Sequence, residues 1–194
     1  MRLFWVFLLL PNLVFAQSDE IQPWQVITAL QADLTGDHRD ERSILVNDFQ
    51  PRDNLSLYIY GFGEPSWQYE LKAYAVDAAW QPDGWGFKTT LTVNEDGNLE
   101  VLSINDSSTR FRGNLKLTIG YLDGEFMLVG YSTDNFDSRD FDASRRCSLN
   151  FLTGQGEMGF PQESRTTSFA HSLDPMPISG WPKDMIVAEC ERFE

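Results

Sequence analysis

Two short turns between stretches of β-forming residues constrain the fold of this 194-residue chain more than any other feature. In the first, residues 94–98 (Asn-Glu-Asp-Gly-Asn) separate the runs 89–93 and 99–104. In the second, Asp123-Gly124 separates residues 114–122 from residues 125–131. Asp-Gly supplies the positive φ that a tight turn between antiparallel strands needs. Each turn therefore predicts a β-hairpin.

The rest of the chain shows related patterns. A third hairpin is expected from the runs 148–152 and 157–160, which are joined by a Gly-rich turn. Further strands are expected at 42–46, 55–60 and, from a more ambiguous pattern, 69–80. Residues 24–30 fit either a strand or a short helix.

No long segment has the period of 3.6 that an amphipathic helix shows. After residue 160 the chain is expected to be irregular and Pro-rich, until Ile186-Val187-Ala188 near Cys190. The chain is therefore predicted to be mainly β, with antiparallel hairpins forming a curved sheet or a β-sandwich. Within 114–122 the residues that face the core are Leu115, Leu117, Ile119 and Tyr121, or else those of the opposite parity.

The N-terminus has the pattern of a secretory signal peptide over residues 1–16, with Arg2 ahead of an apolar run. That run is too short, and is interrupted by Pro11, to cross a bilayer, which takes about 20 helical residues. No later segment is as apolar. We therefore expect an exported protein, periplasmic or secreted, without a membrane span, in which residues 17–194 form a single β-rich domain.

The chain has two cysteines, Cys147 and Cys190. In an exported chain the oxidising surroundings favour a disulfide between them. Since there are also only two histidines, His38 and His171, a zinc site of the usual ligand types is not expected.

The formal net charge is −14, and it becomes one unit more negative when Arg2 leaves with the signal peptide. A surface this acidic repels phosphate backbones and anionic lipids. Nucleic acid is therefore not expected as a partner, whereas a basic protein, a cation or a neutral sugar remains compatible. The sequence does not predict the oligomeric state.

Residues 33–41 carry oxygen-bearing side chains at alternate positions, which is a spacing that suits Ca²⁺. Asp33, Thr35, Asp37 and Glu41 would supply side-chain oxygens, and Arg39 would supply its carbonyl. The segment does not fit an EF-hand, because that motif needs Gly where His38 stands and a bidentate Glu where Ile44 stands.

This segment resembles the FG-GAP type of calcium loop found in integrin-like propellers, in which a shorter acidic run precedes a strand. The chain is also similar to small exported bacterial proteins of unknown function that carry a single such loop, because Gly130-Tyr131 and the stretch 147–156 look like their later motifs. The likeness touches about a third of the chain. It implies a calcium loop, but one copy in this length does not imply a propeller.

Two departures from that motif weaken the calcium interpretation. Thr35 is a poorer ligand than Asn or Asp, and His38 adopts a positive φ less readily than Gly. If calcium binds, we expect weak binding, in the range of about 10⁻⁴ to 10⁻³ M seen in extracellular modules. The alternative is a structural turn, in which Asp and Thr side chains accept hydrogen bonds from backbone amides.

A second acidic stretch, residues 132–144, contains Asp134, Asp137, Asp140 and Asp142. It is expected to be a Ser-rich loop that could dock a basic partner or hold a second cation, although most such runs are merely solvated. Four aromatic residues could form a platform for sugar stacking, or could belong to the core. They are Trp67, Tyr69, Trp80 and Trp85.

Neither histidine lies in a recognisable nucleophile motif, and there is no Gly-rich phosphate loop. The sequence thus favours a binding protein over an enzyme, such as an immunity or inhibitor protein against a toxin or enzyme that attacks the cell envelope. A carbohydrate-binding module or an envelope-acting hydrolase is the alternative.

Overall fold

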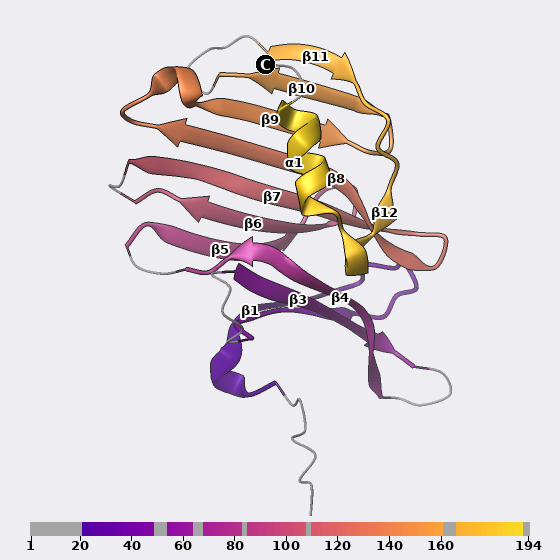
Figure 1. Ribbon diagram of the computed structural model, residues 1–194. Helices are drawn as coiled ribbons and strands as arrows, with labels where there is room; N and C mark the ends of the chain where they lie inside the picture. The colour runs from indigo at the N-terminus through magenta and orange to yellow at the C-terminus, as the bar shows by residue number, and fades with distance from the viewer. Residues whose placement is uncertain are drawn as a thin grey trace, which may run out of the picture.

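The computed structural model of the protein (Figure 1) describes residues 21–48, 54–63, 68–82, 85–107, 110–160 and 166–191. The predicted signal peptide lies outside the described residues. The described residues are mainly β and form two antiparallel sheets, which confirms the predicted fold class of a single β-rich domain.

The first sheet, sheet A, is a four-stranded meander that follows a 3₁₀ turn η1 (Pro23–Gln25). Its strands pair in the order in which they occur along the chain: β1 (Val26–Ala32), β2 (Glu41–Val46), β3 (Asn54–Phe62) and β4 (Tyr69–Trp80). The ambiguous segment 69–80 is therefore a strand. Residues 24–30, which fitted a strand or a helix, combine the end of the 3₁₀ turn with most of β1.

The second sheet, sheet B, has eight strands in the order β11-β10-β9-β8-β7-β6-β5, with β12 paired to β8. Its strands are β5 (Phe87–Val93), β6 (Leu99–Asn105), β7 (Phe111–Leu122), β8 (Glu125–Asp137), β9 (Arg145–Asn150), β10 (Gln155–Gly159), β11 (Thr166–Ala170) and β12 (Met176–Pro177). A 3₁₀ turn η2 (Phe141–Ala143) separates β8 from β9. All three predicted hairpins are present.

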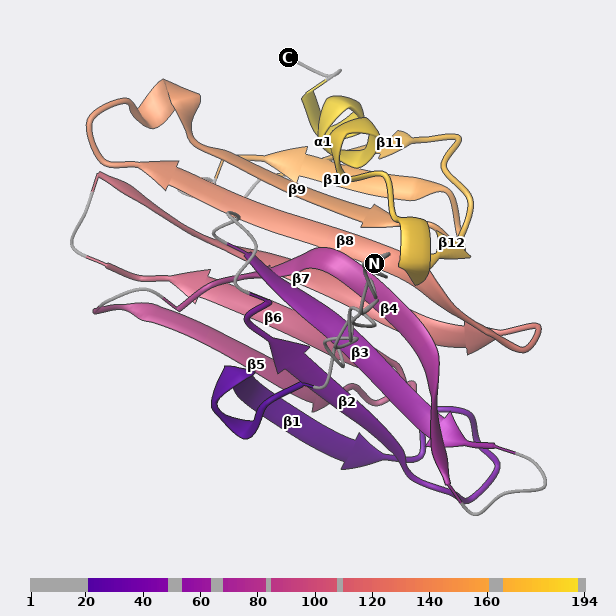
Figure 2. The same ribbon diagram turned by 60° about the horizontal axis from the view of Figure 1, so that its bottom comes forward.

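Sheet A lies across one face of sheet B, on the half that contains β5 to β8 (Figure 2). Because side chains alternate along a strand, each sheet contributes one apolar face to the core between them. In β7, Leu115, Leu117 and Ile119 are buried, which confirms the first of the two parities, while Tyr121 at the end of the strand is 39% exposed.

The C-terminal segment covers the part of the sheet B face that sheet A leaves open. It contains the 3₁₀ turn η3 (Ile178–Gly180) and the helix α1 (Lys183–Glu191), which lies over β9 and β10 (Figure 1). Ile178 and Ile186 are fully buried, and Trp181 Nε1 donates a hydrogen bond of 3.0 Å to the carbonyl of Val76 on β4.

Strand β11, which pairs with β10, and helix α1 both correct the expectation that the chain is irregular from residue 160 until residues 186–188. Only nine residues form α1, too few to show a helical period in the sequence, and tertiary packing stabilises it. The predicted disulfide between Cys147 on β9 and Cys190 on α1 is present, with 5.9 Å between the two Cα atoms. It joins the last turn of the helix to the sheet that the helix covers.

Among the residues that the structure describes, no helix is both long and apolar enough to span a bilayer.

We predict that removing the disulfide, by Cys147→Ala with Cys190→Ala, lowers the free energy of unfolding by about 4 kcal/mol, because the bond closes a loop across 43 residues of sequence. Urea unfolding of the variant and the oxidised parent measures the difference. Leu152→Ala, at an exposed side chain in the β9–β10 turn, is the control and should stay within about 0.5 kcal/mol of the parent. Equal unfolding midpoints for parent and double variant would contradict the prediction.

Candidate functional site

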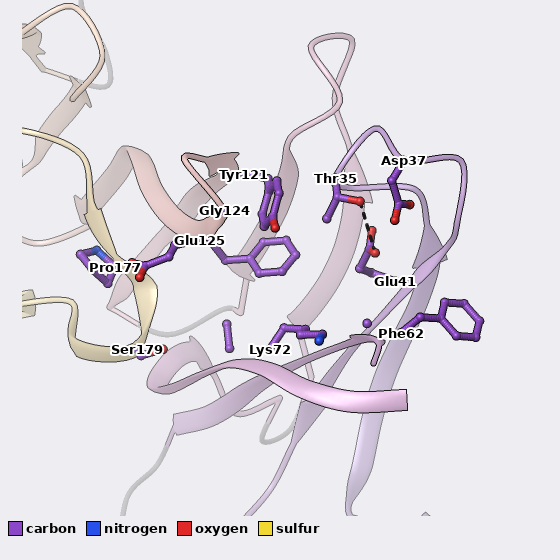
Figure 3. Close-up of a pocket in the computed structure, with 13 residues that line it drawn as sticks. Thr35, Asp37, Glu41, Phe62, Lys72, Tyr121, Gly124, Glu125, Pro177 and Ser179 are labelled. Carbon is purple, nitrogen blue, oxygen red and sulfur yellow. Dashed lines mark hydrogen bonds between the residues drawn. The ribbon is translucent and has the colours of Figure 1, made fainter. Parts of the chain in front are cut away.

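A cavity of about 610 Å³ opens at one end of the sandwich (Figure 3). Four separate parts of the chain form it: the loop between β1 and β2, the facing ends of β3 and β4, the β7–β8 turn, and the segment that contains β12 and η3. The lining residues are Thr35, Asp37, Glu41, Gly61, Phe62, Lys72, Ala73, Tyr121, Gly124, Glu125, Phe126, Pro177 and Ser179. Its volume is within the range of about 300 to 1,000 Å³ that is usual for ligand pockets.

The walls of the cavity carry more negative than positive charge. Figure 3 shows Asp37 and Glu41 on one side and Glu125 on the other, beside Pro177. Among the described residues that line the cavity, only Lys72 is basic, and its Nζ lies 3.3 Å from a carboxylate oxygen of Glu70. The cavity can therefore attract a cationic group.

Aromatic rings form another part of the wall. The rings of Tyr121 and Phe126 are tilted against each other with centroids 5.0 Å apart, at the two ends of the β7–β8 turn. Ring faces attract ammonium and guanidinium groups, so the aromatic wall and the carboxylates favour the same kind of ligand.

Glu41, at the start of β2, is the most enclosed carboxylate of the site and is only 4% exposed. Its Oε2 accepts a hydrogen bond of 2.7 Å from the Leu34 amide, and its Oε1 lies 3.5 Å from the Thr35 hydroxyl. Burial raises the pKa of Glu41, the hydrogen bond from Leu34 lowers it, and the negative charge of Asp37 raises it further. Its contacts hold the loop against β2.

The other carboxylates of the loop bind its own backbone. Asp33 accepts hydrogen bonds from the amides of Gly36 (2.7 Å) and His38 (2.9 Å), and Asp37 accepts one from the Arg39 amide (2.9 Å). These are the contacts that the structural-turn alternative requires. They use oxygens that a calcium ion would need.

Within the described residues there is no group of three or more His, Cys, Asp or Glu side chains placed to hold a metal ion. As arranged, Asp33 and Asp37 direct carboxylate oxygens towards amides of their own loop. Calcium binding by Asp33, Thr35, Asp37, Arg39 and Glu41 stays a prediction.

One residue of the loop other than Gly, His38, has a left-handed backbone conformation. His38 stands where calcium loops have Gly, and it has φ +67°, in the left-handed region. Its side chain is 97% exposed, so packing gives no compensation for this backbone conformation. The presence of His38 in place of Gly therefore strains the backbone locally.

A shallower hollow of about 340 Å³ lies on the other side of the same loop. It is lined by Gln31, His38, Arg39, Asp40, Phe62 and Tyr69. Gln31 donates a 3.0 Å hydrogen bond to the Asp40 carboxylate, and the Tyr69 hydroxyl donates one of 3.2 Å to the Asp40 carbonyl. The loop 33–41 therefore separates two hollows, and Phe62 borders both.

The predicted acidic loop 132–144 is in part a strand, which corrects the sequence interpretation. β8 extends to Asp137, and Asp134 lies opposite Arg146 on β9, with their side chains 3.2 Å apart. Only Asp140 and Asp142 are exposed beyond the strand, and Asp140 accepts a hydrogen bond from the Ala143 amide. The cross-strand pair with Arg146 stabilises Asp134 within β8, although the sequence around it is acidic.

Asp137 is 5% exposed and binds Arg110 through three hydrogen bonds of 2.6 to 2.9 Å. The Arg110 guanidinium lowers the pKa of Asp137 from 3.8 to about 2. Because the pKa of the folded state is depressed, the contribution of this group to stability is present above about pH 4 and is lost as the pH falls towards 2. Asp137 therefore fixes the end of β8 and is not available to a partner.

The predicted aromatic platform does not form from the described residues. Trp67 lies outside them, Tyr69 and Trp80 stand at opposite ends of β4, roughly 36 Å apart along an extended strand, and Trp85 is 98% exposed beyond it. Trp80 packs against the core cluster.

A row of tyrosines on the outer face of sheet A was not expected. The rings of Tyr58 and Tyr60 are stacked at 6.4 Å, and Tyr58 lies 4.7 Å from Tyr74 on β4. The hydroxyls of Ser56, Tyr58 and Tyr74 all donate to the Asp48 carboxylate. Burial, followed by the negative charge of Asp48, raises the pKa of Tyr58. The alternation of Tyr58 and Tyr60 in the sequence was the signal for this row.

Sequence reasoning also missed Lys72, Tyr121, Glu125 and Phe126 as residues of the cavity. The last three flank the Asp123-Gly124 turn, so their position at a hairpin tip could have been inferred. No family model matches the sequence, and comparisons with curated proteins and with solved structures find no match either.

We predict that His38→Gly raises the free energy of unfolding by about 0.5 to 1 kcal/mol. A left-handed residue other than Gly costs about 1 to 2 kcal/mol, and the greater entropy of an unfolded Gly cancels part of the gain. Arg39→Gly is the matched control, because Arg39 has no positive φ, and it should lose stability. Thermal melts compare both with the parent, and a destabilised His38→Gly would contradict the strain argument.

For calcium, the expected result depends on the loop carboxylates. If the ion binds, millimolar Ca²⁺ raises the melting temperature more than Mg²⁺ does at matched ionic strength, and the gain is lost in Asp37→Ala, because binding to the folded state alone stabilises it. If parent and Asp37→Ala respond equally to Ca²⁺, the loop is a turn held by its backbone contacts.

Proposed function

We propose that this chain is an exported binding protein, not an enzyme, and that it captures a basic segment of another protein. The observation that carries the proposal is the cavity at the end of the sandwich. Asp37 and Glu41 lie on one side of it and Glu125 lies on the other, with aromatic rings in the wall between them. An arginine or lysine side chain that enters this cavity would meet carboxylates on both sides and the rings of Tyr121 and Phe126.

The formal net charge of −14 supports the same class of partner. Long-range attraction accelerates the encounter between an acidic and a basic protein, and the cavity then supplies the local contacts. An immunity or inhibitor protein against an envelope-attacking toxin or enzyme would work in this way, by filling its cavity with a cationic side chain of the target.

A carbohydrate-binding module remains the second candidate, on the strength of one feature, the tyrosine row on the outer face of sheet A. Tyr58, Tyr60 and Tyr74 are all half-buried there, with part of each ring accessible. Sugar rings stack on such surfaces, but the hydroxyls of Tyr58 and Tyr74 already bind Asp48. We therefore rank the anionic cavity first.

The test uses the immobilised protein, residues 17–194, as bait for an envelope extract of the native cells. The parent should retain a basic protein that salt elutes, because exposed charges are screened beyond about 8 Å at physiological ionic strength. Glu125→Lys, at an exposed position of the cavity, should weaken that binding by about tenfold or more.

Glu157→Lys is the matched control, since it makes the same change at an exposed position on β10, outside the cavity. It should retain the partner as the parent does. Equal loss in both variants would show that only net charge matters, and unchanged binding by Glu125→Lys would exclude the cavity. Retention of a neutral polysaccharide instead of a protein would favour the tyrosine row.

A further inference from the structure

The end of sheet B opposite the cavity presents four exposed aromatic side chains. Trp85 is 98% exposed, Phe111 60%, Phe141 53% and Phe160 39%. The strand register places them at the same end, because Phe87 pairs with Asn105, Phe111 with Asp137, and Gly159 with Arg146. These four residues are called the aromatic rim, and both views place the ends of these strands on the left (Figures 1 and 2).

The loops that carry the rim are held by backbone hydrogen bonds. The Asp106 amide donates to the Gly86 carbonyl at 2.7 Å, which ties the loop of Trp85 to the end of β6. The Ser138 amide donates to the Arg110 carbonyl at 2.9 Å. These two hydrogen bonds hold the backbone next to Trp85 and Phe111. From β5 to β10 the rim extends over roughly 24 Å, at about 4.8 Å per strand.

Arginines accompany the rim. The guanidinium of Arg110 lies 4.8 Å from the ring centre of Phe111, and that of Arg145 lies 4.8 Å from the ring centre of Phe160. The segments 105–112 and 134–146 together contain five arginines and five aspartates. The net charge of −14 is therefore carried entirely by the rest of the chain.

This distribution distinguishes the rim end from the remaining surface. An anionic surface repels the acidic part of the molecule, so the molecule would approach such a surface with its balanced end first. Arginine pairs readily with phosphate, and aromatic rings partition into the boundary between head groups and acyl chains. Arg110 is held by Asp137, and Arg145 donates to the carbonyls of Asp142 and Ser144. Exposed aromatics at these strand ends, with the exposed Arg112 and Arg139 at the same end, fit that boundary.

We propose that the aromatic rim docks this protein on the phospholipid head-group surface of a membrane, with Trp85, Phe111 and Phe141 entering the interface and the exposed Arg112 and Arg139 facing the anionic head groups. The docking is peripheral and needs no membrane-spanning segment. It leaves the cavity at the other ends of β7 and β8 facing away from the lipid. The negative charge of the whole chain argues against binding to anionic lipid. The segments at the rim end carry equal numbers of arginines and aspartates, so this argument does not hold for the rim.

The test is co-sedimentation of the purified protein, residues 17–194, with vesicles of equal parts phosphatidylethanolamine and phosphatidylglycerol. The parent should sediment with the vesicles, and the tryptophan emission should shift to shorter wavelength. Trp85→Ala combined with Phe141→Ala should lower the partition coefficient by about tenfold or more. Trp85→Phe should retain most of the binding while losing most of the emission shift.

Three control variants separate binding by the rim from nonspecific adsorption, from the effect of charge and from binding by the cavity. Leu152→Ala removes a side chain that is 56% exposed at the opposite end of β9, and it should bind like the parent. Arg139→Glu, exposed on the rim side, should weaken binding to the anionic vesicles but not to vesicles of phosphatidylcholine alone. Glu125→Lys, in the cavity, should bind vesicles as the parent does, so this test is independent of the proposed function.

A parent that does not sediment with vesicles, or a double variant that sediments as well as the parent, would overturn the proposal. Equal loss in the double variant and in Leu152→Ala would also overturn it. If the double variant instead loses a protein from the envelope extract while neither form binds vesicles, the rim is a protein interface and not a lipid one.

Discussion

The structure depends on covering one wide apolar sheet face. Sheet B has seven strands side by side, whereas sheet A has four, so sheet A alone cannot bury all of it. The C-terminal segment covers the remainder with Ile178, Trp181 and Ile186, each 7% exposed or less. The disulfide between Cys147 and Cys190 then fixes the helix to β9. The core is thus enclosed by sheet B, sheet A and the C-terminal segment. The C-terminal segment is short, and the disulfide attaches it covalently to sheet B.

This construction also explains where the cavity lies. Sheet A ends at Gly61 and Phe62 on β3 and at the start of β4, while the β7–β8 hairpin and the β12–η3 segment stand opposite. None of these elements fills the space between the sheets at that end. Tyr121 has the parity of the core residues in β7, but it lies where the partner sheet has ended. A position that would be core elsewhere in the strand becomes a cavity wall.

The hairpins of this fold could be predicted because their signals are local. Asp-Gly turns and alternating apolar residues act within ten residues of one another, and the strands that they predict are present. The helix α1 gave no such signal, because its stability comes from Ile186 and Cys190 packing on distant strands. Asp134 and Asp137 were assigned to a loop on composition, since the arginines that pair with them lie elsewhere in the chain.

The site was predictable only in part, for the same reason. The loop 33–41 was found from its spacing, and Thr35, Asp37 and Glu41 do line the cavity. The opposite wall comes from residues at least eighty positions away, and nothing in the local sequence connects Glu125 with Glu41. The positive φ of His38 was anticipated as a difficulty from the motif alone, since a single residue type at a single position carried that information.

The strands β7 and β8 have twelve and thirteen residues and run from the rim to the cavity without interruption by a loop. At about 3.4 Å per residue, a strand of this length measures roughly 40 Å. Its hydrogen-bonded neighbours on both sides keep it stiff, so the distance between the two ends of the molecule is fixed by the sheet. A molecule bound to a membrane through its rim would therefore hold its cavity at a fixed distance from the membrane surface. It could bind only partners whose basic segment lies at that distance.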